Sequence, residues 1–523
     1  MSSERGPAPA RTESFAEWMS RHGAARDRWL LLGKGPSFSV ERCNAADGYR
    51  RFGLNHIVRQ LRVDVAHATD LDVLESLDPA ALDNAAVWVM PWHPHVRNRP
   101  GDATLDSLAG EHPVLRRLAG EGRLCWYNSS RAADAVPGQP IVPVRFFSAD
   151  AAVHLLAVHG ARHIRTLGVD GGTSYSPSFG DLDGTTLLAN GRSSFDRQFE
   201  AIAEAVFRHD LDFGPLDDEV PVRVYVATEP AQMLATRVLE YSIRRRASIT
   251  SRVYPICDFD IPVPEPQRLE NRPRTPFSFQ RFLIPEAAGL RGRAIYLDSD
   301  MQVFTDIRKL WRQPMHGAPL LSVAALGSDG RRPQFSVMLL DCEGLGWRIG
   351  NIVRRLDDGE LDYAQLMYEM KVAPGWRADI DPAWNCLERY DSGTALLHYT
   401  DMEMQPWISR RNPLAYLWVA ELRSAVACGY IERTYVDDHV ARGWVRPSLA
   451  WQLDHDVDDP LLLPRAARAL DDGYVPPFMS LQTRGLGSPW VSAPVRARAL
   501  ARHVYRSVGL ADAVRRLKNV VFK

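Results

Sequence analysis

Lysine is scarce in this chain of 523 residues, and its cysteines are not paired along the sequence. Only five of the 63 basic residues are lysines, namely Lys34, Lys309, Lys371, Lys518 and Lys523. The six cysteines are scattered over the whole length without a CxxC spacing, which argues against a zinc ribbon and against a small disulfide scaffold. A reducing compartment fits this pattern best.

Long apolar runs are absent as well. The sequence contains no stretch of about 18 apolar residues, the length that a membrane-spanning helix needs. The N-terminal segment MSSERGPAPARTESFAEW also lacks the apolar core of a signal peptide. We therefore expect a cytoplasmic protein.

An excess of charge of either sign is missing too. The 63 Lys and Arg residues balance 64 Asp and Glu residues, which excludes a globally basic nucleic-acid-binding protein. With 45% hydrophobic residues, the chain is not disordered by composition. At about 100–200 residues per domain, its length predicts two to four domains, each with its own core.

The first part of the chain alternates short apolar runs with helical patterns. Residues 1–20 are polar and rich in Pro and Ala, which predicts a flexible tail. Buried parallel strands are predicted in the apolar runs at 29–33, 86–91, 123–130, 140–147 and 163–172. This alternation predicts a Rossmann-like, doubly wound α/β domain over residues 21–215.

A second alternating unit follows a break rich in Pro, Gly and acidic residues at 213–221. We expect a second Rossmann-like domain over residues 220–440, and a helical, basic extension over 441–523. The predicted fold class is therefore α/β, with two doubly wound units and C-terminal helices.

The most informative motif is YLDSDMQVF at 296–304, in which an apolar strand runs into Asp298-Ser299-Asp300. Side chains alternate faces along a strand, so Asp298 and Asp300 are predicted to point the same way and to converge on one hard cation. A lone DxD is common, and its plain interpretation is a turn at the end of a strand.

Several motifs in the right order resemble the retaining glycosyltransferases of family 8, which have the GT-A fold. VYVATEPAQ (224–232) is similar to the strand and loop that hold the nucleoside, FSFQRFLIPE (277–286) to the helix near the sugar nucleotide, and LLHYTDMEMQPW (396–407) to the late histidine motif. The resemblance implies transfer of a hexose from a UDP-sugar to a glycan or glycolipid acceptor. It implies Mn²⁺ or Mg²⁺ on Asp298, Asp300 and His398, and donor binding by Ala227, Thr228, Glu229, Arg281, Ser299 and Gln405.

The resemblance also implies a mechanism without a protein nucleophile, in which the departing phosphate helps to deprotonate the acceptor. Gln334 and Gln365 are then candidates for orienting the acceptor or stabilising the oxocarbenium ion, and a surface amide is the alternative for each. The chain departs from the family at Asp401, where a glycine is usual, and at Gln405, where a lysine precedes Pro-Trp. A neutral glutamine does not provide the lysine's charge to a diphosphate.

The first unit resembles the Rossmann-like domain of bacterial sialyltransferases and motility-accessory-factor glycosyltransferases, in GKGPS (33–37), GLNHIV (53–58), HATDLD (67–72) and the segment 148–171. The resemblance implies an activated sugar at the carboxyl ends of the strands, with candidate residues Gly33, Gly35, Ser37, Asn55, Asp70 and Asp170. A tight strand-to-helix turn is the alternative for GKGPS. His93 and His95 either supply a base or lie in a plain Pro-rich loop.

Two rival interpretations remain open at this stage. The N-terminal domain either performs a second sugar transfer, serves as an acceptor-binding module or is a relic; alternatively, the whole chain is a non-catalytic scaffold in polysaccharide assembly. Residues 494–523 carry eight Lys or Arg residues and one acid, with a rough apolar face. This segment predicts either peripheral contact with the inner face of an anionic membrane or packing on the GT-A domain.

Overall fold

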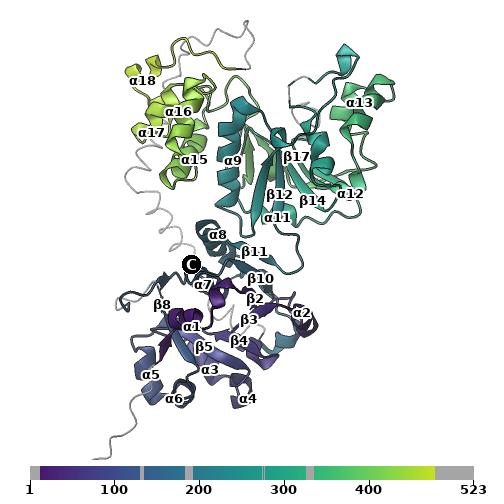
Figure 1. Ribbon diagram of the computed structural model, residues 1–523. Helices are drawn as coiled ribbons and strands as arrows, with labels where there is room; N and C mark the ends of the chain where they lie inside the picture. The colour runs from purple at the N-terminus through teal and green to yellow at the C-terminus, as the bar shows by residue number, and fades with distance from the viewer. Residues whose placement is uncertain are drawn as a thin grey trace, which may run out of the picture. The chain divides into compact units, whose positions relative to one another are not determined.

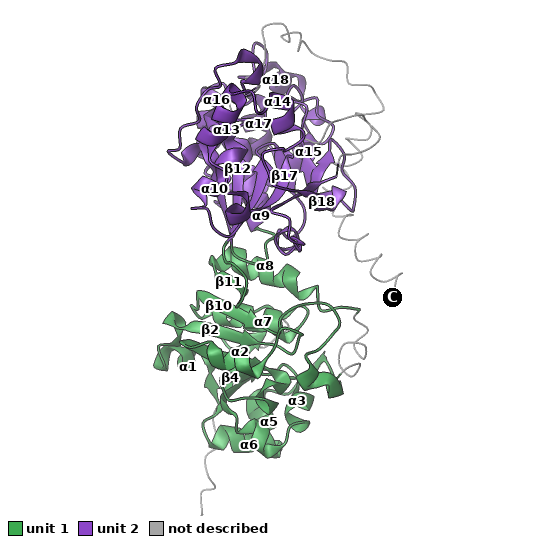
Figure 2. Cartoon of the chain, turned by 90° about the vertical axis from the view of Figure 1, so that its right-hand side faces the viewer, with its two compact units in different colours: residues 1–221, 245–250 green, residues 222–244, 251–523 purple. Residues whose placement is uncertain are grey.

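The computed structural model divides the chain into two compact units (Figure 2). Unit 1 consists of residues 1–221 and 245–250, and unit 2 of residues 222–244 and 251–523. The structure describes residues 12–129, 135–182, 193–273, 275, 277–324 and 335–477. The acceptor-side candidate Gln334 and the basic segment 494–523 lie outside the described residues, so the predictions for them stay predictions.

Unit 1 is built on a wholly parallel sheet (Figure 1). Its strand order is β1-β8-β5-β4-β3-β2-β10-β11, with β9 paired to β8. The strands are β1 (Glu13–Ser14), β2 (Arg28–Leu32), β3 (Tyr49–Leu54), β4 (Val63–His67), β5 (Ala85–Pro91), β8 (Leu124–Ser129), β9 (Ile141–Val142), β10 (His163–Leu167) and β11 (Asp212–Pro215). This arrangement confirms the parallel sheet predicted for the first part of the chain.

The strands of this sheet contribute residues to two hydrophobic cores. In β2, Trp29 and Leu31 pack in one core and Leu30 and Leu32 in another, all fully buried. The helices of unit 1 are α1 (Phe15–Arg21), α2 (Val40–Ala45), α3 (Leu71–Glu75), α4 (Pro79–Leu82), α5 (Leu105–Glu111), α6 (Pro113–Gly120), α7 (Ser148–Val158) and α8 (Gln198–His209). A sheet buried on both faces explains why its strands are continuous apolar runs in the sequence.

The prediction of a flexible tail over residues 1–20 is wrong for residues 12–20. Strand β1 pairs with β8 in parallel, and helix α1 follows it directly. Ser14 and Glu17 form a capping box at the start of α1, and Phe15 is fully buried in the core. The polar composition of the segment hid this short amphipathic helix.

Unit 2 contains a six-stranded mixed sheet in the order β13-β12-β14-β17-β16-β18. Strands β12 (Val222–Ala227), β13 (Ser251–Pro255) and β14 (Arg293–Asp298) run parallel, whereas β17 (Val337–Asp341) is antiparallel to both β14 and β16 (Leu320–Val323). Strand β18 (Arg377–Ile380) closes the other edge. Unit 2 is thus α/β as predicted, but its sheet is mixed where unit 1 is purely parallel.

A three-stranded sheet, β15-β20-β19, completes the strands of unit 2. Its members are β15 (Met301–Val303), β19 (Cys386–Leu387) and β20 (Leu396–His398). The helices before residue 400 are α9 (Met233–Arg244), α10 (Ile284–Ala287), α11 (Arg308–Trp311), α12 (Cys342–Leu345), α13 (Ile349–Asp357) and α14 (Tyr363–Met367).

The C-terminal helices begin earlier than residue 441, the predicted start of the helical extension. They are α15 (Ala415–Ala427), α16 (Arg433–Ala441), α17 (Ser448–Asp454) and α18 (Arg465–Ala469). Helix α15 packs against α9, and α16 packs against α17. The four helices follow one another with no strand between them, so a boundary at residue 440 cuts through a packed group. No helix within the described ranges combines the length and the apolar character needed to cross a bilayer.

Candidate metal and donor site

The predicted acidic motif lies at the carboxyl end of β14, in the middle of the mixed sheet. Asp298 is the last residue of this strand, and Ser299 and Asp300 form a turn before β15. The prediction assumed that the strand continues through Asp300, so that alternation of the side chains points both carboxylates the same way. This assumption is wrong, because the chain turns after Asp298. The two carboxylates still converge, since the turn brings Asp300 back beside the strand end.

The histidine comes from the small sheet. His398 ends β20 and lies opposite Met301 in the antiparallel pairing with β15. The amide of Tyr399 donates to the carbonyl of Asp300 over 2.8 Å, and the amide of Glu388 donates to the carbonyl of His398 over 3.1 Å. These backbone bonds fix His398 next to the acidic turn, from which it is almost 100 residues distant in sequence.

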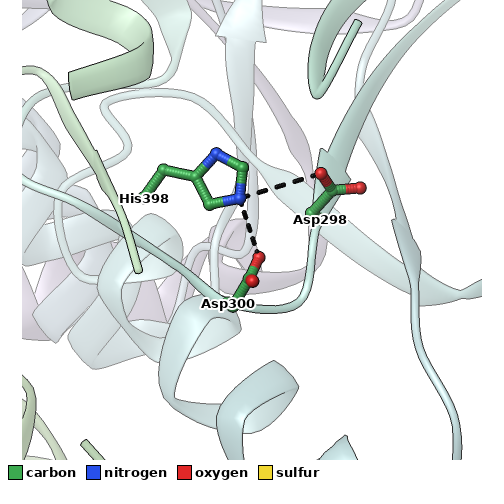
Figure 3. Close-up of side chains that lie close together, drawn as sticks. All are labelled: Asp298, Asp300 and His398. Atoms are coloured by element: carbon green, nitrogen blue, oxygen red, sulfur yellow. Dashed lines mark ion pairs between the residues drawn. The ribbon is translucent and has the colours of Figure 1, made fainter. Parts of the chain in front are cut away.

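Asp298, Asp300 and His398 form one three-ligand group (Figure 3). His398 Nε2 lies 3.0 Å from Asp300 Oδ1 and 3.8 Å from Asp298 Oδ2, and one ligand atom from each side chain lies within 4.8 Å of the others. Asp300 Oδ1 is buried and accepts no hydrogen bond of good geometry within the described part of the chain. Two carboxylates and an imidazole suit a divalent ion such as Mn²⁺, so the residues present fit a metal.

A hydrogen bond behind His398 determines how its ring is presented. His398 Nδ1 lies 3.0 Å from Asn385 Oδ1, and because an amide oxygen only accepts, Nδ1 carries the proton. The Nε2 lone pair of the neutral ring is then directed at the two carboxylates. Burial disfavours the charged ring, but Asp300 and Asp298 outweigh this effect and raise the pKa of His398. A proton and a cation thus compete for Nε2.

Two buried side chains, one aromatic and one basic, lie beside the carboxylate of Asp298. The hydroxyl of Tyr296, two residues earlier on the same face of β14, donates to Asp298 Oδ1. Arg281 Nη2 lies 3.8 Å from the same oxygen, and its guanidinium carbon is 4.9 Å from the centre of the Tyr296 ring. Arg281 also donates to the carbonyl of Phe335 over 3.2 Å. Arg281 therefore lies beside Asp298, a candidate metal ligand, and its role in donor binding stays a prediction.

Asp300 is held by Gln405, the residue that stands where the resembling family has a lysine. Gln405 Nε2 donates to Asp300 Oδ2 over 2.9 Å and to the carbonyl of Tyr399 over 3.3 Å. Gln405 is only 3% exposed. Its amide thus orients the carboxylate of Asp300, a candidate metal ligand.

Replacing Gln405 with alanine is expected to weaken Mn²⁺ binding by about 10–100-fold, because a metal ligand loses the partner that orients it. Isothermal titration of Mn²⁺ into the full chain measures this change. Gln267→Ala, at an exposed glutamine of the same unit, is the matched control and should leave the affinity unchanged. Equal affinities for Gln405→Ala and wild type would show that Asp300 needs no such support.

The loop predicted to hold the nucleoside lies next to this site. Ala227, the last residue of β12, pairs with Asp298 across the sheet, which places the following loop beside the acidic turn. The side chain of Gln280 binds both backbone groups of Thr228, each over 2.9 Å. Burial raises the pKa of Glu229, whose Oε1 has no hydrogen-bond partner among the described residues. Gln280 thus holds the backbone at Thr228 in place, and Glu229 Oε1 is a buried hydrogen-bond acceptor.

Ser299 connects this loop to the acidic turn. Its hydroxyl donates to Gln232 Oε1, and both side chains are 2% exposed. Sequence reasoning did not identify Gln232, Gln280 or Asn385 as part of the site. Gln280 could have been noticed because it precedes Arg281 in the recognised helix motif, whereas a lone Asn385 or Gln232 carries no signal of its own.

Gln365 has a structural task. It occupies the third position of α14, where its side chain and that of Asp362 form a capping box. Gln365 Oε1 accepts from the amide of Asp362 over 3.1 Å. Its assignment as an acceptor-side residue stays a prediction.

Comparison with known proteins gives partial matches. No family model matches the chain. Protein CDI from Arabidopsis thaliana is 34% identical over 98 residues, and this match covers 18% of the chain and 37% of that protein's length. The chain thus spans little more than a third of this curated relative.

Three solved structures align with parts of the chain. They are the galactosyltransferase LgtC (14% identity, 39% of this chain and 96% of that one, TM-score 0.28), the glycosyltransferase GlyE of Streptococcus pneumoniae TIGR4 (16%, 40% and 64%, 0.28) and mouse xyloside xylosyltransferase 1 (14%, 34% and 98%, 0.25).

In unit 1 the turn that carries the candidate residues Gly33, Gly35 and Ser37 uses its backbone amides internally. Gly33 and Gly35 donate to the carbonyls of Leu167 and Gly168 over 2.8 Å each, and the amide of Ser37 donates to Asp170 Oδ2 over 2.7 Å. A Cβ at Gly33 would lie 2.3 Å from the Gly168 carbonyl oxygen, which explains the glycine. The three amides are therefore engaged within the protein, as expected for the alternative of a tight strand-to-helix turn, which packs against the loop after β10. The assignment of these residues to an activated sugar stays a prediction.

The other candidates of unit 1 are dispersed along the carboxyl edge. Asn55 Nδ2 donates to Ser148 Oγ over 3.3 Å, and Asp70 Oδ1 accepts from the amide of Asn98 over 2.7 Å. His95 lies in the small hairpin of β6 (His95–Val96) and β7 (Arg99–Pro100), and His93 lies just before this hairpin. His93 Nδ1 lies 3.2 Å from the carbonyl oxygen of Asp102.

Proposed function

We propose that unit 2 is a metal-dependent retaining glycosyltransferase of the GT-A type, similar to family 8, that moves a hexose from a UDP-sugar to a glycan or glycolipid acceptor. The observation that carries this proposal is the convergence of Asp298, Asp300 and His398. These residues come from two motifs that are 98 residues apart in sequence, and they meet at the carboxyl end of the inner strand β14, next to the loop after β12. Convergence of this kind is not expected of three unrelated polar residues.

In the proposed reaction the chain binds a diphosphate and stabilises the negative charge that develops on it as the sugar leaves. Asp298, Asp300 and His398 would hold Mn²⁺ or Mg²⁺, which when bound acts as a Lewis acid toward the diphosphate. Asn385 keeps His398 Nε2 available, and Gln405 orients Asp300. Arg281, beside Asp298, adds a positive charge on the donor side.

The remaining donor contacts are assigned by position. Ala227 ends β12, and Thr228 and Glu229 begin the loop that follows it. The buried carboxylate oxygen Glu229 Oε1 suits an N–H or O–H group of the nucleoside as a hydrogen-bond partner. Gln334 and Gln365 remain the proposed acceptor-side residues. Retention follows in this proposal from attack of the acceptor on the face from which the diphosphate departs.

Incubating the full chain with UDP-glucose, UDP-galactose and UDP-N-acetylglucosamine, with and without Mn²⁺, tests this proposal. We expect release of UDP from at least one donor that requires Mn²⁺ and stops with EDTA. Binding of UDP without hydrolysis or transfer of any donor would favour the scaffold interpretation. Release that is equally fast in EDTA would contradict the metal-dependent mechanism.

A further inference from the structure

The mixed sheet of unit 2 has strands on both sides of the candidate metal site. Asp298 ends the inner strand β14, and β12, with the loop proposed to hold the nucleoside, lies on one side of it. Strand β17 lies next to β14 on the other side (Figure 1), followed by β16 and by β18 at the edge. Because the nucleoside occupies the β12 side in the proposed function, the acceptor approaches from the β17 side.

Arg281 connects the metal site to the start of β17. Its Nη2 lies 3.8 Å from Asp298 Oδ1, and its Nη1 donates to the carbonyl of Phe335 over 3.2 Å. Phe335, two residues before β17, has a φ of 50°, which is unfavourable for a residue with a bulky side chain and has to be held by surrounding contacts. The contact with Arg281 thus fixes Phe335 relative to Asp298.

The ring of Phe335 supports Trp376, the residue before β18. The two ring centres are 4.9 Å apart at an angle of 81°, an edge-to-face arrangement that aromatic pairs favour. Trp376 packs against the same hydrophobic core as Tyr296. Tyr296 and Asp298 lie two residues apart on β14 and point to the same face of the sheet. Trp376 therefore lies on the face that carries Asp298.

Part of Trp376 is open to solvent. The side chain is half-buried, and the three residues that follow it, 377–379, are exposed. The indole N–H makes no hydrogen bond within the described ranges and reaches solvent. Trp376 thus offers a fixed apolar ring and a free hydrogen-bond donor side by side.

This exposure distinguishes Trp376 from a tryptophan that only fills the core. Trp347 packs in the same core but is 3% exposed, and its N–H donates to the carbonyl of Val372 over 3.3 Å. The ring of Trp376 is held on one side and open on the other. Such a ring suits a sugar, because the C–H groups on one face of a pyranose pack on an aromatic ring while its hydroxyl oxygens accept from an N–H.

We propose that Trp376 binds a sugar ring of the acceptor, and that the acceptor is a saccharide of at least two rings. Three contacts, none longer than 4.9 Å, connect Trp376 to Asp298 through Arg281 and Phe335. Since these two side chains separate the indole from the metal ligand, Trp376 contacts a ring other than the one that receives the transferred sugar. This inference rests on the function proposed for unit 2 and specifies its acceptor.

Steady-state kinetics of the full chain test the inference. UDP release in Mn²⁺ is measured with the best donor, while the acceptor is methyl glucoside or methyl galactoside, each with one ring, or lactose, cellobiose or maltose, each with two. We expect one disaccharide to stimulate release with a KM at least about tenfold lower than that of either monosaccharide. Release that no saccharide stimulates would contradict this inference alone, whereas no release from any donor would overturn the proposed function with it.

Trp376→Leu should raise the KM for the disaccharide by at least about tenfold and change kcat less, because it removes binding of the acceptor. Trp376→Phe keeps a flat ring without the N–H and should raise the KM by less. Trp451→Leu, at a half-buried tryptophan of α17, is the matched control and should keep the wild-type KM. Thermal unfolding verifies that each variant is folded. The inference is overturned if disaccharides stimulate release no more than monosaccharides, or if folded Trp376→Leu and Trp376→Phe both keep the wild-type KM.

Discussion

Replacing Asp300 with asparagine is expected to lower metal-dependent UDP release by about 10³-fold or more, and Asp298→Asn should have a similar effect. Each change removes one negative charge from a group of three ligands while keeping the size of the side chain. Loss of a ligand removes several kcal/mol of charge stabilisation from the departing diphosphate. Initial rates at saturating Mn²⁺ with the best donor measure the effect.

Both variants should fold normally, because the two carboxylates lie at a strand end and in a turn, outside the apolar core. Asp358→Asn, at an exposed carboxylate that follows α13, is the matched control and should keep full activity. A folded Asp300→Asn protein with the wild-type rate would show that the cation is held elsewhere or is not needed.

The second large effect concerns Arg446, which is 1% exposed and lies between the C-terminal helices and the segment that carries Gln405. Its guanidinium donates to the carbonyl of Pro406 over 3.0 Å, to Ser448 Oγ over 2.6 Å and to Gln452 Oε1 over 2.5 Å. Its amide donates to the carbonyl of Trp407 over 2.8 Å. Burial lowers its pKa to about 10, so the arginine remains charged at pH 7.

Arg446→Met is expected to destabilise unit 2 by about 3–5 kcal/mol, because it leaves buried acceptors without donors. The unfolding midpoint of unit 2 should fall by on the order of 10 °C. Mn²⁺ affinity should fall as well, because Pro406 follows Gln405 directly. Calorimetric unfolding measures the stability, with Arg442→Met, at a largely exposed arginine, as the matched control. Identical melting of Arg446→Met and wild type would mean that this network does not hold the segment.

The sequence predicted the α/β class and the parallel sheet of unit 1 because buried strands and their helices leave strong local patterns. The sequence also predicted that Asp298, Asp300 and His398 lie together. However, the argument for why the carboxylates of Asp298 and Asp300 converge was incomplete. Alternation along a strand assumes that the strand continues, whereas the chain turns at Ser299. The convergence depends instead on the pairing of β15 with β20, which is a contact between distant segments.

Side chains that support the ligands were less accessible to sequence reasoning. Asn385 and Gln232 are ordinary polar residues in sequence, and their roles arise only from where the chain brings them. Gln405 was assigned to donor binding from its place in a motif, yet its amide donates to Asp300. In unit 1 the glycines of the turn after β2 serve close packing, as Gly33 does against the carbonyl of Gly168.

The central claim is that Asp298, Asp300 and His398 form one metal site that binds the diphosphate of the donor. Calorimetric titration of UDP into the wild-type chain and into His398→Ala, each with Mn²⁺ and with EDTA, tests it most directly. We expect Mn²⁺ to tighten UDP binding by at least about 100-fold in the chain with His398 and to have little effect in His398→Ala. Equal strengthening by Mn²⁺ in both chains, or UDP binding that is the same in Mn²⁺ and EDTA, would contradict the account.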